Sequence, residues 1–260
     1  MKFVTLKKKS LVAALVALVL TVALILGIGF TGAAQVWGGE STRKLPIYCV
    51  DKGDEKVVAI SFDACWGNEK TAGILETLEK HDVKANYFVV GSWAEQYKDD
   101  LKMLADSGRV EIGTHSNTHP HMPKLSTKQM ELELTTSASL IENITGKKVE
   151  LFRAPYGDYS DAMLTVTEKL GLYTIQWDVD SLDWKDLSAG EITSRILGNV
   201  KPGSIVLMHN DGKNTLAALP AIIEGLKNKG YSLVTIGELI MRQDYTIDHT
   251  GKQISSKTRR

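Results

Sequence analysis

The stretch Glu111-Ile-Gly-Thr-His-Ser-Asn-Thr-His-Pro120 places two histidines, His115 and His119, four residues apart behind a short apolar run. Neutral imidazoles at this spacing bind one metal ion if the backbone makes a single turn between them. The His-Glu-x-x-His helix of zinc proteases does not fit, because Ser116 stands where that motif has glutamate. We therefore expect the pair on a loop that leaves a strand, where α/β proteins build active sites. Taken alone, the pair leaves a metal site and a structural role equally open.

The segments around this stretch alternate between strand and helix patterns. Short β-branched and apolar runs, as at Val57–Phe62, predict strands, and apolar residues at helical spacing, as at Lys70–His81, predict helices. The predicted strands cover 57–62, 86–90, 110–113, 149–152, 173–179, 204–208 and 232–235, and the predicted helices cover 70–81, 94–106, 126–143, 161–170, 189–199, 215–228 and 236–241. This alternation indicates an α/β fold with a parallel sheet, either barrel or doubly wound. We predict a distorted (β/α) barrel of about seven parallel strands.

The N-terminus has the pattern of a membrane anchor. A basic segment, residues 1–10, precedes the uncharged apolar run Leu11–Phe30, which is long enough to cross a bilayer. We predict a transmembrane helix at 11–30 that precedes the barrel and places the rest of the chain outside the cell membrane as a single-pass protein. The alternative is a secretory signal cleaved near Ala34, which would release the protein.

The remaining chain divides into three parts. Residues 31–55 form a tether and a first strand, Leu45–Val50, which we expect to pair with the next strand across a tight turn at Asp51–Asp54. Residues 56–242 form the globular domain. Residues 243–260 form a polar tail, which we expect to be disordered or to lie on the surface.

Composition limits the possible partners. The chain has 260 residues, of which 43% are hydrophobic and 24% charged, so it is large enough to bury one full core. Its formal net charge is zero, which gives no support to a nucleic-acid partner. We expect a monomer. Cys49 and Cys65 leave two alternatives open, a disulfide or two free thiols.

Five polar residues stand at or just beyond the ends of predicted strands: Asp63, His115, Arg153, Asp183 and His209. Each alone has an ordinary structural explanation, such as a helix cap for the aspartate or a surface ion pair for the arginine. In a βα barrel, however, the loops after the strands converge on one face. We therefore expect these side chains to share one site, and we expect His81, His121 and His249 at the surface.

Taken in order, these segments resemble the motifs of the polysaccharide deacetylase family, the NodB-homology domain of the carbohydrate esterases. The motifs are His-Ser-x-x-His at His115, Arg-x-Pro-Tyr at Arg153, Asp-Trp at Asp183 and Leu-x-His at Leu207. The resemblance covers Lys56–Ile240. The phrases Ser-Phe-Asp-x-x-Trp-Gly, around Asp63, and Gly-Ser-Trp-Ala-Glu, residues 91–95, are also similar to the sporulation-associated peptidoglycan deacetylase branch of spore-forming Gram-positive bacteria.

The resemblance implies a metal-dependent hydrolase that removes N-acetyl groups from cell-wall polysaccharide, above all from peptidoglycan amino sugars. His115 and His119 would bind a divalent metal, zinc ahead of cobalt or manganese. Asp63 would be the general base, held in place by Arg153. The backbone N–H of Tyr156 would stabilise the oxyanion.

The same resemblance implies roles on the leaving-group side. His209 would be the general acid, oriented by Asp183. Trp184 and Leu207 would form an apolar pocket for the acetyl methyl group, and Pro155 would also contact the substrate. Three alternatives remain: a carbohydrate-binding protein with impaired catalysis, an O-acetyl esterase and a chitooligosaccharide deacetylase.

One residue departs from the family pattern. Ala64 occupies the place of a second aspartate, which the family uses as the third protein ligand of its metal. Asn68 or Glu69 on the following loop are the candidates to replace it. We expect Cys65 to point to the other side of the strand end and so not to be a ligand.

Overall fold

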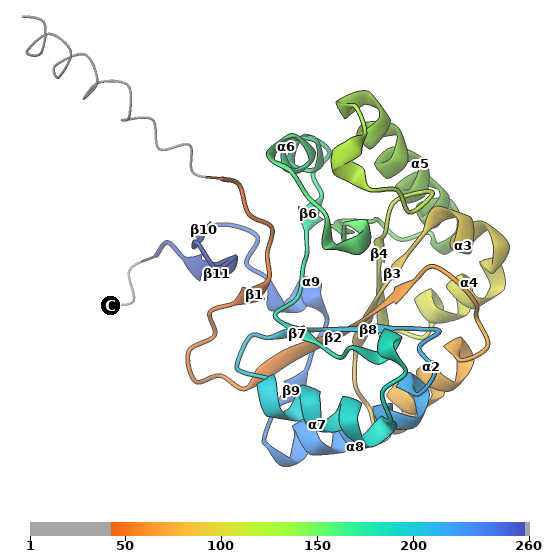
Figure 1. Cartoon of the computed structure of the whole chain (residues 1–260), viewed down its shortest axis with the longest axis vertical. Coiled ribbons are helices and arrows are strands. Elements are labelled where there is room, and N and C mark those ends of the chain that lie inside the picture. The colour runs from red at the N-terminus through yellow and green to blue at the C-terminus, as the bar shows by residue number, and fades with distance from the viewer. Residues whose placement is uncertain (1–42, 258–260) are drawn as a thin grey trace, which may run out of the picture. The chain divides into compact units, whose positions relative to one another are not determined.

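The computed structural model describes residues 43–257. Its main sheet has the strand order β6-β5-β4-β3-β2-β8-β7, with β9 paired to β2, and all neighbouring strands in it are parallel (Figure 1). The strands are β2 (Val57–Ala64), β3 (Ala85–Val89), β4 (Val110–Thr114), β5 (Leu151–Phe152), β6 (Tyr173–Thr174), β7 (Val179–Asp180), β8 (Ile205–His209) and β9 (Ser232–Leu233).

The two edge strands show that this sheet is curled. β6 and β7 lie at opposite edges, yet only Ile175–Asp178 connects them. That link spans at most roughly 17 Å, whereas seven strands laid flat would separate the edges by about 29 Å. The sheet is therefore a half-barrel in which seven parallel strands follow one another, as predicted, and β9 adds an eighth beside β2. The segment predicted as one strand, 173–179, is instead two short strands, because the chain crosses from one edge to the other within it.

All the described helices except the last, short one cover the outside of the half-barrel. The helices are α2 (Thr71–Lys80), α3 (Gly91–Gln96), α4 (Lys98–Asp106), α5 (Thr127–Thr145), α6 (Asp161–Lys169), α7 (Ala189–Asn199), α8 (Thr215–Asn228) and α9 (Ile236–Leu239). The predicted helix 94–106 is two helices, which meet at Tyr97 because its φ of −120° and ψ of 51° are not helical. Capping boxes of Ser126 with Gln129 and of Ser188 with Glu191 begin α5 and α7.

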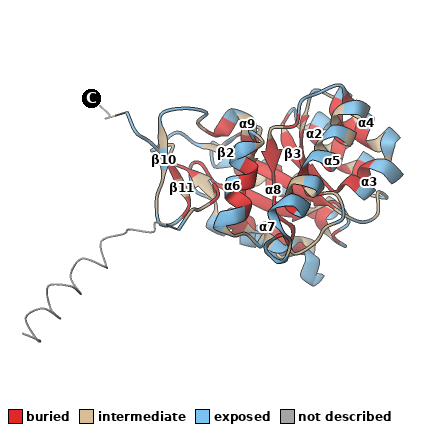
Figure 2. Cartoon of the chain, turned by 90° about the horizontal axis from the view of Figure 1, so that it is seen from above, coloured by how far each residue is buried: buried red, intermediate tan, exposed pale blue. Residues whose placement is uncertain are grey.

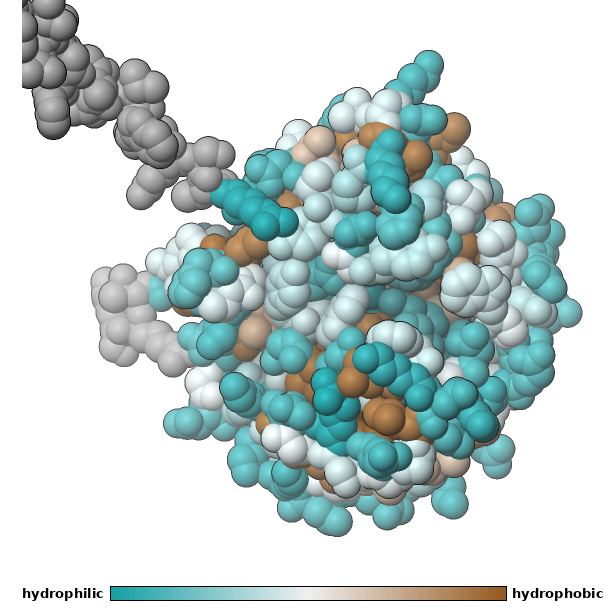
Figure 3. Space-filling model, in the orientation of Figure 1, coloured by the Kyte–Doolittle hydropathy of each residue, from teal (hydrophilic) through white to brown (hydrophobic). Residues whose placement is uncertain are grey.

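The core has two parts, on the two faces of the strands. One lies between the strands and the helices outside them, and the other lies inside the half-barrel, where Ile236 and Leu239 of α9 pack with Ala59 of β2. Seven of the eight residues of β2 are buried, the continuous burial expected of a parallel strand covered on both faces. Figure 2 shows the same division, with buried residues on the strands and exposed residues on the outer faces of the helices. On the face seen in Figure 3, hydrophilic side chains cover most of the surface and hydrophobic ones form small patches.

The C-terminal segment is not the tail that we expected. Its strands β10 (Tyr245–Ile247) and β11 (Lys252–Ser255) form an antiparallel hairpin, and β11 pairs in parallel with β1 (Cys49–Val50). The predicted pairing of the first strand with the next one in sequence is therefore wrong. The hairpin is fixed by the buried Gln253, whose side-chain amide accepts from the Met241 N–H at 2.7 Å and donates to the Met241 carbonyl at 2.8 Å.

The structure also contradicts the predicted location in the cell membrane. No helix within residues 43–257 is long and apolar enough to cross a membrane. The longest of them, α5, has 19 residues but carries charged side chains such as Lys128 and Glu131. The membrane location is therefore withdrawn. The predicted transmembrane segment 11–30 and the predicted cleavage site near Ala34 lie outside the described residues.

Candidate functional site

The site lies where the strands of the half-barrel end. A pocket of about 690 Å³ is lined by residues on the loops that follow β2, β4, β5, β7 and β8. Eight of the ten predicted site residues line it: Asp63, His115, His119, Tyr156, Asp183, Trp184, Leu207 and His209. The other two, Arg153 and Pro155, are buried without lining the pocket. The half-barrel thus brings together groups that are up to 146 positions apart in the sequence.

Asp63 and Arg153 form a buried ion pair. The Arg153 guanidinium donates from Nη1 to Asp63 Oδ1 at 2.8 Å and from Nη2 to the Gln176 carbonyl at 3.2 Å. Its planar group lies over the Phe88 ring, 4.2 Å from the ring centroid. Burial alone would raise the pKa of Asp63, but the charge of Arg153, followed by His115, lowers it below its usual value. Asp63 is therefore an oriented carboxylate at neutral pH.

His115 follows β4 and is held in one tautomer. Its Nδ1 lies 2.8 Å from the Arg153 carbonyl oxygen, which accepts only from a protonated nitrogen. The lone pair of Nε2, 3.5 Å from Asp63 Oδ2, is then left for a ligand. Burial lowers the pKa of His115, so this contact with Asp63 joins a neutral imidazole and a carboxylate and is not an ion pair.

The His119 ring packs edge-on against the His115 ring, with 5.0 Å between the ring centroids. Burial, and then His115, lower the pKa of His119 to about 4. Both imidazoles are therefore neutral at pH 7, the state in which histidine binds a metal ion. The turn between them requires left-handed backbone at Ser116, with φ of 71°, and at His119, with φ of 59°.

His209 and Asp183 form a second polar pair at the end of β8. His209 Nδ1 lies 2.8 Å from Asp183 Oδ1, and Asp183 Oδ2 accepts from the His209 N–H at 2.8 Å and from Thr215 Oγ1 at 2.5 Å. Burial would lower the pKa of His209, but the hydrogen bond and charge of the fully buried Asp183 raise it above its usual value. His209 is therefore the histidine of the pocket whose charged form is favoured.

Tyr156 occupies a short 3₁₀ helix, η2 (Pro155–Gly157), with a left-handed φ of 60°. Its ring packs edge-on against His119, with centroids 4.5 Å apart, and stacks on His121 at 4.2 Å. His121 Nδ1 lies 2.7 Å from Asp158 Oδ2, so His121 links the loops after β4 and β5. Sequence reasoning gave His121 no role, although its place two residues after His119 was a signal.

The strand end after Asp63 differs from our expectation. Cys65 lines the pocket, whereas Ala64 is fully buried and packs in the hydrophobic core. Cys65, the first residue beyond β2, therefore lies on the pocket side together with Asp63, and the prediction that it points away is wrong. Burial, and then Asp211 and Asp63, raise the pKa of the Cys65 thiol to about 12. Both cysteines are free, so the structure favours the alternative of two thiols.

The loop residues proposed as replacement ligands are engaged elsewhere. Asn68 Nδ2 donates to Asp100 Oδ2 at 2.7 Å, and Glu69 Oε2 accepts from the Asn68 N–H at 3.1 Å. Among residues 43–257 no group of three or more His, Cys, Asp or Glu side chains is arranged to hold a metal ion. The neutral imidazoles of His115, whose tautomer is fixed by the Arg153 carbonyl, and of His119, whose ring packs against that of His115, fit a divalent metal held by two protein nitrogens.

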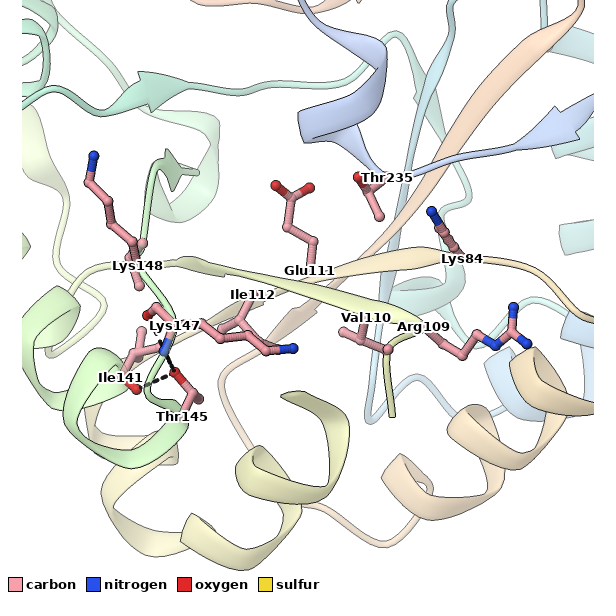
Figure 4. Close-up of a pocket in the computed structure, with 12 residues that line it drawn as sticks. Lys84, Arg109, Val110, Glu111, Ile112, Ile141, Thr145, Lys147, Lys148 and Thr235 are labelled. Atoms are coloured by element: carbon pink, nitrogen blue, oxygen red, sulfur yellow. Dashed lines mark hydrogen bonds between the residues drawn. The ribbon is translucent and has the colours of Figure 1, made fainter. Parts of the chain in front are cut away.

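A smaller pocket, of about 270 Å³, lies at the opposite ends of β3 and β4 (Figure 4). Its cationic side chains point in different directions and have other partners: Arg109 pairs with Asp82 at 2.6 Å, and Lys84 with Glu238. The Glu111 carboxylate accepts from the Gly237 N–H at 2.8 Å. Without convergent polar groups, this pocket has no features of an active site.

Comparison with known proteins identifies the family. Residues 51–175 match the model of the family described as polysaccharide deacetylase. The solved structure of a peptidoglycan N-acetylglucosamine deacetylase is 31% identical with a TM-score of 0.72, over 75% of this chain and 92% of that one. The chain belongs to the polysaccharide deacetylase family. The resemblance in its sequence motifs is confirmed.

Two other relatives of the polysaccharide deacetylase family bear on function. The peptidoglycan N-acetylglucosamine deacetylase PgdA of Listeria monocytogenes is 38% identical over 71% of this chain, which spans only 39% of that protein's length. A family 4 carbohydrate esterase pseudoenzyme from Bacillus anthracis has a TM-score of 0.73 and 35% identity, over 80% of this chain and 72% of that one. The family therefore includes both deacetylases and a pseudoenzyme at similar distance from this chain.

The buried ion pair generates a prediction about stability. We expect Arg153→Met to lower the free energy of unfolding by about 3–5 kcal/mol at neutral pH, because it leaves the Asp63 carboxylate buried without a partner. The double variant Asp63→Asn/Arg153→Met should lose less than Arg153→Met alone. Urea unfolding of the wild type, of Arg153→Met, of Asp63→Asn and of the double variant measures these energies.

Acid pH supplies the control. Arg153 lowers the pKa of Asp63 in the folded state. The ion pair therefore stabilises the folded state fully above the unfolded-state pKa of about 4, and this stabilisation is lost as the pH falls through the lowered folded-state pKa. The difference between wild type and Arg153→Met should therefore shrink in acid. If the loss in free energy of unfolding in the double variant equals the sum of the losses in the two single variants, the ion pair is not the cause of the destabilisation.

Proposed function

We propose that the chain is a metal-dependent hydrolase that removes N-acetyl groups from peptidoglycan amino sugars, with zinc preferred to cobalt or manganese. One observation carries the proposal: an oriented carboxylate, Asp63, and a protonatable imidazole, His209, line the same pocket as two neutral histidines. These are the base, the acid and the metal ligands that amide hydrolysis requires. The peptidoglycan substrate is suggested by the names of the relatives.

His115 and His119 would hold the metal. A bound divalent metal polarises the amide carbonyl and lowers the pKa of a water molecule. Asp63 accepts the proton of the attacking water, and Arg153 keeps the receiving carboxylate in position through its bond to Oδ1. The other oxygen, Oδ2, faces His115 and is the one nearer to the metal ligands.

The remaining residues act on the tetrahedral carbon and the leaving amine. The Tyr156 N–H, on a backbone turned by its positive φ and preceded by Pro155, donates to the developing oxyanion. His209 gives its Nε2 proton to the sugar nitrogen, while Asp183 holds Nδ1 and favours the charged imidazole. Trp184 and Leu207 contact the acetyl methyl group. The products are acetate and a free amino sugar.

A carbohydrate-binding protein without catalysis is the second candidate. It is favoured by Ala64, by the two-histidine metal site and by a pseudoenzyme among the structural relatives. Against it stand the two hydrogen-bonded pairs, Asp63 with Arg153 and His209 with Asp183, because a binding groove needs neither. An O-acetyl esterase or a chitooligosaccharide deacetylase would use the same groups, and the choice of substrate in the assay separates them.

The decisive experiment is release of acetate. We expect the purified full-length protein to release acetate from N-acetylated muropeptides with zinc and not after chelation. Asp63→Asn should reduce the rate by ~100-fold or more, because it removes the base. Its zinc content, measured by atomic emission, should remain that of the wild type, since Asp63 is not one of the two proposed ligands.

Controls separate the candidates. Acetylated xylan and N-acetylglucosamine oligomers tested in parallel identify an esterase or a chitooligosaccharide deacetylase. No acetate from any substrate with zinc, cobalt or manganese, together with retained glycan binding, would establish the second candidate. Full activity of Asp63→Asn would show that another group is the base.

The Asp183–His209 pair predicts a pH dependence. His209 acts as an acid, so activity is present below its raised pKa and is lost as the pH rises through that value. Asp183→Asn removes the charge that raises this pKa, so the alkaline limb of the kcat profile should move to lower pH. The exposed pocket residue Asp186 provides the matched control, Asp186→Asn, whose limb should stay in place. An unmoved limb in Asp183→Asn would contradict this role of Asp183.

The missing third ligand predicts a gain of function. Ala64→Asp should tighten zinc binding by ~10-fold or more, because it supplies a carboxylate where the family has one. Isothermal titration with zinc measures the affinity. As Ala64 is buried, the variant should melt at lower temperature without zinc and recover with it. Cys65→Ser is the control; if it lowers zinc affinity instead, the thiol is the third ligand.

A further inference from the structure

Exposed aromatic side chains gather at the mouth of the pocket. Among residues 43–257, the large hydrophobic side chains that remain exposed are Trp66 (62%), Leu132 (64%), Tyr156 (59%) and Trp184 (57%). Three of these four line the catalytic pocket. Exposed apolar groups collected around a cleft indicate a binding surface, and flat aromatic rings suit the apolar faces of sugar rings. Trp66, the tryptophan of the phrase Ser-Phe-Asp-x-x-Trp-Gly, is the one of these three aromatic residues to which the mechanism gives no role.

The loop that carries Trp66 is held firmly beneath it. The Gly67 carbonyl accepts two partly buried hydrogen bonds, from Trp93 Nε1 at 2.7 Å and from Asn210 Nδ2 at 2.9 Å. Gly67 has a φ of 58°, and a Cβ there would lie 2.7 Å from the Glu69 carboxylate. Two residues before Trp66 in the sequence, the Ala64 carbonyl accepts from the Val90 N–H at 3.0 Å. The backbone on both sides of Trp66 is thus fixed by hydrogen bonds, while its indole ring is exposed to solvent.

The sheet order places Trp66 beside the reacting group. Strand β8, which ends at His209, lies between β2 and β7, so the loops with Trp66 and Trp184 flank His209. The Trp66 ring also packs edge-on to His119, with centroids 5.4 Å apart. Since His209 would protonate the nitrogen of the reacting sugar, a sugar at His209 has Trp66 at its side.

We propose that Trp66 is a substrate-binding residue whose indole stacks on the sugar unit next to the one that is deacetylated. The substrate is then a glycan chain and not a free amino sugar. The placing of the reacting sugar rests on the proposed function. The stacking itself requires only that a glycan occupies the pocket.

An uncharged glycan is the suitable probe. The pocket lining carries five aspartates, Asp63, Asp180, Asp183, Asp186 and Asp211, and one lysine, Lys213. Negative groups on a ligand would be repelled there, which would obscure the contribution of one stacking contact. N-acetylglucosamine oligomers have no charge and offer the same apolar ring face on every unit.

The experiment compares chain lengths in a variant that cannot turn over. Calorimetry of zinc-loaded, full-length Asp63→Asn protein measures the affinity for the N-acetylglucosamine tetramer and monomer. Adding Trp66→Ala should weaken tetramer binding by about tenfold, the size of an aromatic stacking contact, and leave monomer binding unchanged. Trp66→Phe should recover most of the loss. Leu132→Ala, an equally exposed apolar side chain on α5 away from the pocket lining, should have no effect.

Two outcomes would overturn the proposal. Unchanged tetramer binding in Trp66→Ala would show that the indole does not contact the chain. Lower zinc affinity in Trp66→Ala, or an equal loss for monomer and tetramer, would show that Trp66 only positions His119. If the wild type releases no acetate while Trp66→Ala selectively weakens tetramer binding, the proposed hydrolase fails and the stacking site stands.

Discussion

The buried pairing of Arg153 with Asp63 is the interaction on which the site depends. Taking both charges out of water costs several kcal/mol per ion, and only their mutual attraction and the surrounding hydrogen bonds offset it. The same arginine also presents its backbone carbonyl to His115 Nδ1. One residue at the end of β5 therefore orients the proposed base and sets the tautomer of a proposed metal ligand. One residue thus fixes the proposed base and the proposed metal ligand relative to each other.

Strained backbone surrounds this pair. Non-glycine residues with left-handed φ include Ser116, His119, Tyr156 and Leu182, and all four stand on loops that follow strands of the half-barrel. Each such residue costs of the order of 1–3 kcal/mol and persists only where its surroundings fix it. The parallel strands that carry these loops form a rigid support, because the short link between β6 and β7 holds the two edges of the sheet close together. The rigid strands and the strained loops together fix the orientation of the imidazoles, although the imidazoles stand on loops and not on helices or strands.

Local sequence patterns predicted much of this structure. The predicted bounds of α7 and α8 match, because apolar spacing and caps are local signals. The motifs also predicted which side chains gather in one pocket, since strand ends meet on one face. The C-terminal hairpin was missed because its pairing partner, β1, is some 200 positions away and its buried residue is the polar Gln253. Trp66 was missed because exposure, the property that distinguishes it, depends on the folded surface.

The pairing of β1 with β11 has a consequence for how the domain is completed. Cys49, near the start of the described chain, lies opposite Lys252, near its end. This is a contact of very long sequence separation, which forms late compared with contacts between neighbouring elements. The other edge of β1 contacts the half-barrel, because the Val50 N–H donates to the Gly203 carbonyl at 3.0 Å and Cys49 forms a β-bridge with Ser204. β1 therefore joins the C-terminal hairpin to the half-barrel, and loss of β11 would leave one edge of β1 open to wrong pairing.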